Sequence, residues 1–520
     1  MNNENHDFKY KWATWGDLNA FFGLMLDNVT NLVILNGILV FGFGYPVDYV
    51  FTKMIPGTAF GVFIGDLIYT WMAIKLAQKT KNPNVTAMPL GLDTPSTIGM
   101  AVAVMGPTFI ATGKNPEITW YVGMSVMIVM GIIKLIMSFI GQFIQKVVPQ
   151  AGLLGSLAGI GLALLGFLPL IDTFKMPIVG LISLGIILYT IVAKLKLPGN
   201  IPGVFAAVFI GTVIYYILGN FNLLGEGIHF KTPDIKLQFA LPLPNLGFLY
   251  GMKDAIPYLP IAIPFGLLTI VGGINVTESA KAAGDDFKTR DILLVEAFAT
   301  IAAGLCGGVA QSTPYIGHPA YKAMGARAGY TLGTGLFIGI GGILGYVSFI
   351  VDLIPTAAVA PILIFVGLEI ITQAFHVCPK KHTPAVAFSF LPIISDLVLI
   401  EFGKLMNVLG KTTTDLTGEM LLEFNIINAL GHGFILTAML WGAILSFIID
   451  KDLKNAFLYL IITSLFTFFG IIHSVKPNGD IYLPWLTGST IPYYFTIAYL
   501  TLALFLSILN HFNKNSTTEK

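Results

Sequence analysis

Charged side chains are scarce in this sequence. They make up 11% of its 520 residues, whereas a soluble globular domain carries charge on roughly a quarter of its residues. Hydrophobic residues reach 55%, so the chain cannot cover a water-facing surface, and this excludes an ordinary soluble protein. The formal net charge of +1 gives no long-range attraction for nucleic acid, and we expect no nucleic-acid partner.

Cysteine is nearly absent as well. The chain has two, Cys306 and Cys378, and neither belongs to a metal-ligand spacing. We expect both to be packing residues, and we expect neither a bound metal nor a cofactor. The glycine-rich residues 333–342 lack the Lys-Ser/Thr pair of a P-loop, so no nucleotide site is predicted there.

Long apolar runs are abundant. They recur from Leu18 to His511 with short polar gaps between them, and a membrane-spanning helix needs about 20 mostly apolar residues. The runs divide into about sixteen segments, an even number that places both termini on one side of the membrane. The excess of Lys and Arg in the connecting segments on that side predicts that it is the cytoplasm. We expect a multi-pass protein of the cell (inner) membrane.

The sequence contains an internal repeat. Three local matches occur in the same order on the two sides of residues 220–254, which are rich in Pro, Gly and Lys. Seven spans in each half would insert the second half upside down, which is the inverted-repeat geometry of many transporters. The matches pair residues 28–31 with 275–278, residues 89–95 with 314–319, and Gly161-Leu162 with Gly367-Leu368.

These observations predict the fold class and the domain organisation. We expect an all-α integral membrane protein with a 7+7 transmembrane inverted repeat, two broken spans and about two extra C-terminal helices. The predicted parts are a cytoplasmic N-terminus (1–17), a first seven-span repeat (18–219), an extracellular connector (220–254), a second, inverted seven-span repeat (255–449), two extra transmembrane helices (450–510) and a cytoplasmic tail (511–520).

The third and tenth spans are the predicted broken spans. Each opens with Pro and Gly where a continuous helix needs backbone donors, and an unpaired backbone group costs several kcal/mol in hydrocarbon. We expect a short extended stretch in each, followed by a half-helix that begins near Asp93 or His318. Asp93 is a suitable N-cap for the helix that Pro95 would start. The N–H groups of the two half-helices would then face a polar ligand near the midplane. Ordinary proline kinks are the alternative.

Residues of the second half resemble the nucleobase-cation symporter group, which includes xanthine, uracil and vitamin C permeases, and are nearest its azaguanine-type purine branch. The resemblance rests on Val276-Thr277-Glu278-Ser279, Thr313-Pro314-Tyr315-Ile316 and the stretches at 299–304 and 325–329. It implies a core of spans one, three, eight and ten and a gate of spans five to seven and twelve to fourteen. Glu278 matches the family's acidic residue that hydrogen-bonds the base. Gly317-His318 departs from the acidic or amide residue, followed by Asn or Ser, that the family carries there.

The predicted site gathers polar residues of these four spans. Glu278, His318 and Asp27 are candidates for binding the coupling ion or proton, because a titratable group within the membrane needs a partner or a function. Alternatives are that Glu278 pairs with Lys281, that His318 is a packing residue, and that Asp27 ties core helices together. The predicted substrate-binding residues are Glu278, His318, Gly317, Asp93, Leu92, Thr94, Asn275, Thr277, Asn28, Thr30 and Tyr315.

The sequence therefore predicts a secondary active transporter, not an enzyme. We expect a symporter that couples a proton or sodium to a small polar solute, with a purine or pyrimidine nucleobase as the first candidate. The alternatives are an anion transporter of the sulfate type on the same fold, a passive channel and, more remotely, an intramembrane enzyme. Its partners would be the solute, the ion and the lipid bilayer. For the two extra helices two roles stay open, contacts in a homodimer or insulation of the core.

Overall fold

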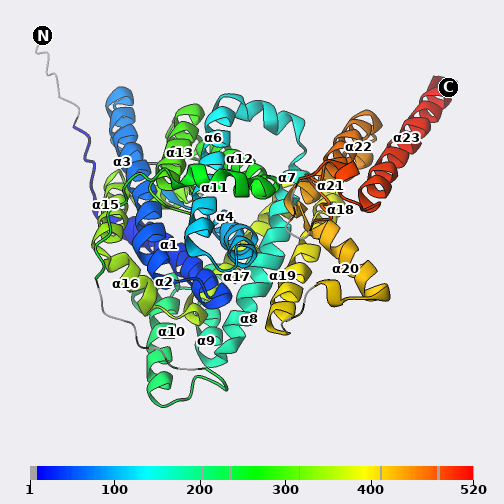
Figure 1. Ribbon diagram of the computed structural model, residues 1–520. Helices are drawn as coiled ribbons and strands as arrows, with labels where there is room; N and C mark the ends of the chain where they lie inside the picture. The colour runs from blue at the N-terminus through cyan, green and yellow to red at the C-terminus, as the bar shows by residue number, and fades with distance from the viewer. Residues whose placement is uncertain are drawn as a thin grey trace, which may run out of the picture. The chain divides into compact units, whose positions relative to one another are not determined.

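The chain folds almost entirely into helices (Figure 1). The computed structural model describes residues 9–201, 203–228, 230, 232, 237–315, 317–409, 411, 413–476, 479 and 481–518. Within these residues nine helices are long and apolar enough to cross a membrane, and two sharply bent helix pairs raise the number to eleven. The protein is a multi-pass membrane protein. Cys306 and Cys378 are buried and free, as the sequence predicts.

The first half of the chain runs from α1 to α10. Several of its helices contain a wider π-helical stretch, and one strand interrupts the series. The elements are α1 (Trp15–Asn36) with η1 (Gly37–Gly42), α2 (Val47–Tyr49) with η2 (Val50–Met54), α3 (Ile55–Thr80), β1 (Leu90–Leu92), α4 (Thr94–Gly99), η3 (Met100–Met105), α5 (Gly106–Ala111), α6 (Pro116–Val147), α7 (Gln150–Ile160), η4 (Gly161–Phe167), α8 (Leu168–Lys175), α9 (Pro177–Ile187) with η5 (Leu188–Val192), η6 (Pro198–Asn200) and α10 (Gly203–Asn220).

The second half repeats the pattern with a second strand. A short helix, α11 (Gly247–Ala255), lies in the region expected to be a connector. The elements that follow are η7 (Ile256–Tyr258), α12 (Leu259–Ala282), α13 (Thr289–Leu305), β2 (Ser312–Pro314), α14 (His318–Ala323), α15 (Gly329–Leu344), α16 (Tyr346–Leu353), α17 (Thr356–Val377), η8 (Lys380–His382), α18 (Thr383–Phe388), α19 (Leu391–Leu409), η9 (Thr413–Asp415), α20 (Gly418–Gly431), α21 (Phe434–Ile449), α22 (Leu453–Phe468), η10 (Pro484–Leu486) and α23 (Ile491–Thr518).

The chain divides into two compact units. Unit 1 holds residues 1–141, 172–255 and 265–362, and unit 2 holds residues 142–171, 256–264 and 363–520. Both strands belong to unit 1. In unit 2, α7 packs on α21, and the two helices beyond the repeat, α22 and α23, pack on each other.

Helix α3 is central to unit 1 because it packs against both α13 and α15 (Figure 1). The α13 side of α3 carries a glycine at every fourth position. A Cβ on Gly57 would meet the backbone after α13, and one on Gly61 would lie 2.7 Å from the Ala303 side chain. Without side chains at these positions the two backbones approach closely, as small-residue stripes allow in membrane helices. This contact positions α3 and α13 beside the two strands.

Two pairs of consecutive helices are sharply bent. The helices α15 and α16 meet at 89° and α20 and α21 at 76°. Both bends lie at glycines with left-handed backbone, Gly345 with φ of 80° and Gly433 with φ of 71°, a conformation that other residues rarely adopt. The first bend lies within residues 329–351, which the sequence predicts as one span.

The predicted match of Gly161 with Gly367 corresponds to a contact inside unit 2. A methyl group added to Gly161 would lie 2.9 Å from the Gly367 carbonyl oxygen. Two residues at equivalent places of the repeat therefore touch, as expected where a two-fold axis relates two halves.

Candidate functional site

Two short strands, one from each half, meet inside unit 1. Strands β1 and β2 pair antiparallel, with Leu90 opposite Pro314, Gly91 opposite Thr313 and Leu92 opposite Ser312. Further backbone bonds of 2.9 Å extend the pairing at both ends, from Asp93 N to Gln311 O and from Tyr315 N to Pro89 O. We call this pair of strands the ribbon. It confirms the extended stretches predicted at both broken spans.

Within the described residues the sheet has two strands, and side chains bond the outer edge of β1. The Leu92 N–H donates to Asn28 Oδ1 at 3.0 Å, and Asn31 Nδ2 donates to the Leu92 carbonyl at 3.4 Å. The Leu90 N–H reaches Asp66 Oδ1 at 3.4 Å. An unpaired backbone group costs several kcal/mol in hydrocarbon, so these polar residues of α1 and α3 allow a strand to exist at this depth.

The outer edge of β2 is held by a fully buried lysine. Lys134 Nζ, from α6, donates to the Ser312 carbonyl at 3.0 Å and to the Thr300 hydroxyl at 3.2 Å. It also pairs with Glu296 on α13 at 2.8 Å, and both side chains of this pair are 0% exposed. Burying two charges is costly unless they are paired and hydrogen-bonded, and here the three acceptors match the three donors of an ammonium group. Glu296 is thus the counter-charge of Lys134.

A half-helix follows each strand. Helix α4 begins at Thr94, and Asp93 is its N-cap, accepting the Ser96 N–H at 3.0 Å. Through η3 and α5 this helix continues to Ala111. Helix α14 begins at His318. Both start positions and the cap are those that the sequence predicts.

One face of the ribbon is polar and accessible. Successive strand residues alternate between the two faces, so Gly91, Asp93 and Tyr315 share a face. A Cβ on Gly91 would lie 3.2 Å from Asp27 Oδ2 of α1, which places the Asp27 carboxyl group over this face. The Tyr315 side chain is 36% exposed, and Asp27 and Asp93 are half-buried. We call this set, together with Gln311 and Thr313, the ribbon face, and it is the candidate site.

Gly317 provides room for the tyrosine of the ribbon face. A Cβ at this position would lie 2.9 Å from the Tyr315 ring and 3.0 Å from the Tyr321 ring, closer than two carbon atoms approach. The two rings thus occupy the space that a side chain at position 317 would fill. This explains in physical terms why no acidic or amide residue stands there.

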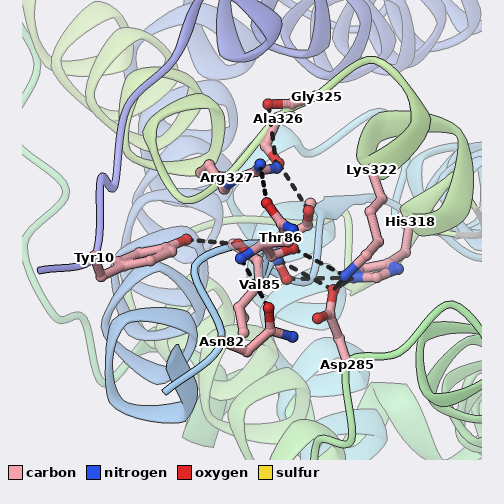
Figure 2. A network of polar contacts seen from close by, with 12 residues as sticks. Tyr10, Asn82, Val85, Thr86, Asp285, His318, Lys322, Gly325, Ala326 and Arg327 are labelled. Atoms are coloured by element: carbon pink, nitrogen blue, oxygen red, sulfur yellow. Dashed lines mark hydrogen bonds and ion pairs between the residues drawn. The ribbon is translucent and has the colours of Figure 1, made fainter. Parts of the chain in front are cut away.

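His318 lies in a different polar cluster, centred on Asp285. Figure 2 shows the Asp285 carboxylate facing both His318 and Lys322. Asp285 Oδ2 is 3.2 Å from His318 Nε2 and 2.6 Å from Lys322 Nζ, and it accepts the Thr86 N–H at 3.1 Å. Since His318 Nε2 also lies 3.3 Å from the Thr86 carbonyl, this nitrogen carries a proton. Asp285 and His318 are both fully buried.

The N-terminal segment is joined to this cluster through residues 85–86. Tyr10 donates to the Val85 carbonyl at 2.7 Å, and the Thr86 hydroxyl donates to the Ala326 carbonyl at 2.7 Å (Figure 2). Burial raises the pKa of the Tyr10 hydroxyl, so it stays protonated and keeps its role as a donor. The segment before α1 and the turn after α14 are thereby tied to the residues that precede β1.

The structure brings some of the predicted site residues together and uses others elsewhere. Asp27, Asp93 and Tyr315 meet at the ribbon face, next to Leu92, Thr94 and Gly317 in the chain. Asn28 serves the edge of β1, and the buried Thr277 hydroxyl donates at 2.7 Å to the Gly273 carbonyl of its own helix. Thr30 is also buried, at 6% exposure. Glu278 and Asn275 lie on α12, and their side chains are outside the described part of the structure.

Gln311, Asp285 and Asn31 were not predicted as site residues. Gln311 directly precedes β2 and places its amide nitrogen 3.5 Å from Asp93 Oδ2. Its position just before the predicted break was the available signal. Asp285 sits in a hydrophilic connection between two spans, where an acidic residue is unremarkable. Lys281, which the sequence allows as a partner of Glu278, contacts Asp286 at 3.4 Å.

No protein-family model and no curated protein matches the chain. Several solved structures are similar to the chain. The transmembrane domain of the cyanobacterium bicarbonate transporter BicA has 16% identity and a TM-score of 0.49, over 75% of this chain and 96% of that chain. SLC26A9 has 12% identity and a TM-score of 0.51, over 72% and 61% of the two chains. The murine Slc26a9 anion transporter in the inward-facing state has 14% identity and a TM-score of 0.51, over 76% and 69%.

These likenesses bear on the fold. The predicted resemblance to nucleobase permeases is not confirmed by them. At identities of 12% and 14%, the two likenesses with a TM-score of 0.51 show a shared architecture. Together with the paired strands and the bent helices, they confirm the predicted fold class, a helical membrane protein built as a 7+7 inverted repeat with two broken spans.

Proposed function

We propose that the protein is a secondary active transporter that binds a small polar solute at the ribbon face. The observation that carries this proposal is the ribbon itself, because non-helical backbone at membrane depth is tolerated only where it is buried in protein or lines a cavity. Here the ribbon leaves Tyr315 accessible and places the carboxyl groups of Asp27 and Asp93 beside it. Two half-helices that start at a common centre are typical of transporter binding sites.

A small anion, taken up together with a cation, is the favoured substrate. One of the similar solved structures is described as an anion transporter. The carboxyl groups of Asp27 and Asp93 would repel a bare anion, so a cation must accompany it. Coupled entry of cation and anion removes this repulsion.

A nucleobase is the second candidate. Asp27 Oδ2 is buried and has no hydrogen-bond partner among the described residues, and a carboxylate oxygen is a good acceptor for the ring N–H of a base. The resemblance of residues 276–279 and 313–316 to nucleobase permeases supports this candidate. In that case Glu278 would hydrogen-bond the base, and Glu278 or His318 would carry the coupled proton.

Uptake into proteoliposomes tests the proposal. Purified protein is reconstituted and given labelled bicarbonate, sulfate, uracil or hypoxanthine, each with an inward sodium gradient, an inward proton gradient or no gradient. We expect saturable, gradient-driven uptake and counterflow of one anion. Nucleobase uptake alone would select the second candidate. Unsaturable flux without counterflow would mean a passive channel and would overturn the proposal.

Two substitutions connect uptake to the site. Asp27→Asn and Glu278→Gln are each expected to abolish gradient-driven uptake, because each removes a titratable charge of the proposed coupling site. Asp172→Asn is the matched control, since Asp172 forms an exposed pair with Lys175, and it should transport at the wild-type rate. Full uptake by Asp27→Asn would show that the ribbon face is not the coupling site.

The orientation is part of the proposal. We place both termini in the cytoplasm, on the basis of the Lys and Arg distribution. A cysteine added next to residue 9 and one next to residue 511 should both resist a membrane-impermeant maleimide in intact cells and react after permeabilisation. Labelling of either in intact cells would reverse the assignment.

A further inference from the structure

We infer that the ribbon face contains a site for a monovalent cation of the sodium class, bound by oxygen atoms of Asp27, Asn31 and Gln311. This deepens the proposed function, which requires a cation but does not say where it binds. The inference concerns binding alone and can be tested without transport.

Unused acceptors of these three residues carry the inference. Asp27 Oδ2, Asn31 Oδ1 and Gln311 Oε1 are buried and have no hydrogen-bond partner within the described part of the chain. The Asn31 and Gln311 side chains are 1% and 0% exposed. Buried polar atoms are normally satisfied, so three unpaired acceptors near one strand end indicate a ligand.

The orientation of the two amides follows from their donor atoms. Asn31 Nδ2 donates to the Asp27 carbonyl at 3.1 Å and lies 3.4 Å from the Leu92 carbonyl. Gln311 Nε2 faces Asp93 Oδ2 at 3.5 Å. A flipped amide would place oxygen against oxygen in each case, so the free atoms are the oxygens.

The three residues converge on the end of β1. Asp27 and Asn31 are four residues apart on α1 and therefore lie on the same side of that helix. Asp27 is over Gly91, Asn31 contacts Leu92, and Gln311 is opposite Asp93, bonded to it by backbone. The three residues thus all lie beside the same three strand residues, 91–93.

The charge of this group fits a monovalent ion. Carboxylate and amide oxygens are the ligands that hard cations take. Asp27 contributes one free carboxyl group, whereas the carboxylate of Asp93 is engaged by the Ser96 N–H and by Gln311. The buried Lys134 is engaged with Glu296 at the other edge of the ribbon. Among the three proposed ligands only Asp27 carries a charge, and the other two offer neutral amide oxygens, so this set of ligands matches one positive charge.

Thermal unfolding of the detergent-purified protein tests the inference. Wild type is titrated with sodium chloride against choline chloride and potassium chloride at constant ionic strength, with no solute present. A ligand that binds only the folded state raises the unfolding temperature, so we expect a saturable rise with sodium that choline does not produce. Asp27→Asn and Gln311→Met should each raise the half-saturating sodium concentration at least about tenfold, as loss of a supporting group does at metal sites. Asp172→Asn should titrate like wild type.

Each outcome decides the inference. A wild-type protein that sodium and choline stabilise equally would overturn it, even if a variant fails to fold. Wild-type half-saturation in both Asp27→Asn and Gln311→Met would show that sodium binds elsewhere and would also overturn it. In a separate titration without sodium, stabilisation by uracil or hypoxanthine, together with no effect of sodium, would identify the free acceptors as a solute site and overturn the inference. Sodium binding without any uptake would leave the cation site standing and reject the proposed transport function.

Discussion

Replacement of Lys134 by methionine is expected to destabilise the protein strongly. The side chain keeps its length but loses its charge and all three donors. Glu296 is then buried at 0% exposure without its counter-charge, and the Ser312 carbonyl at the edge of β2 loses its donor. The ribbon would lose its support from α6.

The magnitude follows from the contacts. Removal of one partner from a buried ion pair costs about 3–5 kcal/mol, and a carbonyl left unsatisfied adds about 1–3 kcal/mol. Since unfolding entropy is about 2.1 cal/mol/K per residue, these losses should reduce the unfolding temperature by roughly 4–7 °C in a chain of 520 residues. A second change, Glu296→Gln, removes the carboxyl group that is left without a counter-charge. The double variant should therefore recover a large part of the lost stability.

The unfolding temperature of each variant can be measured by intrinsic tryptophan fluorescence during heating, because the chain has 6 Trp residues. The control is Lys404→Met, since Lys404 pairs with Glu401 at 2.7 Å but the two side chains are 45% and 41% exposed. Such surface pairs contribute at most about 1 kcal/mol. The reasoning is refuted if Lys134→Met and Lys404→Met unfold at the same temperature. It is also refuted if adding Glu296→Gln to Lys134→Met does not raise the unfolding temperature.

Two further predictions concern other parts of the chain. Gly317→Ala should reduce solute affinity about tenfold or more while the protein still folds. The added methyl carbon would lie 2.9 Å from the Tyr315 ring, so the ring must move. An affinity equal to that of wild type in a binding titration would contradict this. Hydrogen bonds from Lys381 and then His382 lower the pKa of Asp450, so its contribution to stability is present above its ordinary pKa of about 3.9 and is lost as pH falls through the lowered value. Asp450→Asn should therefore unfold at a lower temperature than wild type at pH 6 and at the same temperature near pH 2, and a difference that persists in acid would reject the linkage.

The broken spans could be predicted because their cause is local. Proline removes a backbone donor and glycine weakens a helix wherever they occur, and Asp93 before Thr94-Pro95 is an N-cap signal that needs no knowledge of the rest of the fold. The helix starts at Thr94 and His318 follow from the same signals. The bends at Gly345 and Gly433 were not predicted, because a single glycine in an apolar run is equally compatible with a straight, closely packed helix.

The contacts of individual site residues depend on tertiary structure and could not be predicted. Asn28 and Asp27 are neighbours on α1, yet one completes the edge of β1 and the other lies over the ribbon face. Neighbouring residues point about 100° apart around a helix, so the rotation of α1 decides which of the two faces the strand edge. The sequence does not give this rotation. His318 was expected beside the solute, but it contacts Asp285, which is more than 30 residues away in the chain.

The two edges of the ribbon also bear on how the two halves of the chain are related and on whether the chain can be cut between them. Lys134 comes from the first half and completes the strand of the second half, together with Glu296 and Thr300 of that second half. The edge of β1 uses Asn28, Asn31 and Asp66, all from its own half. A symmetric pair of first halves would bring together two copies of β1 and leave both lysines without a glutamate. The halves have thus become unequal partners, so a chain cut between them should recover its fold only when both different fragments are made together.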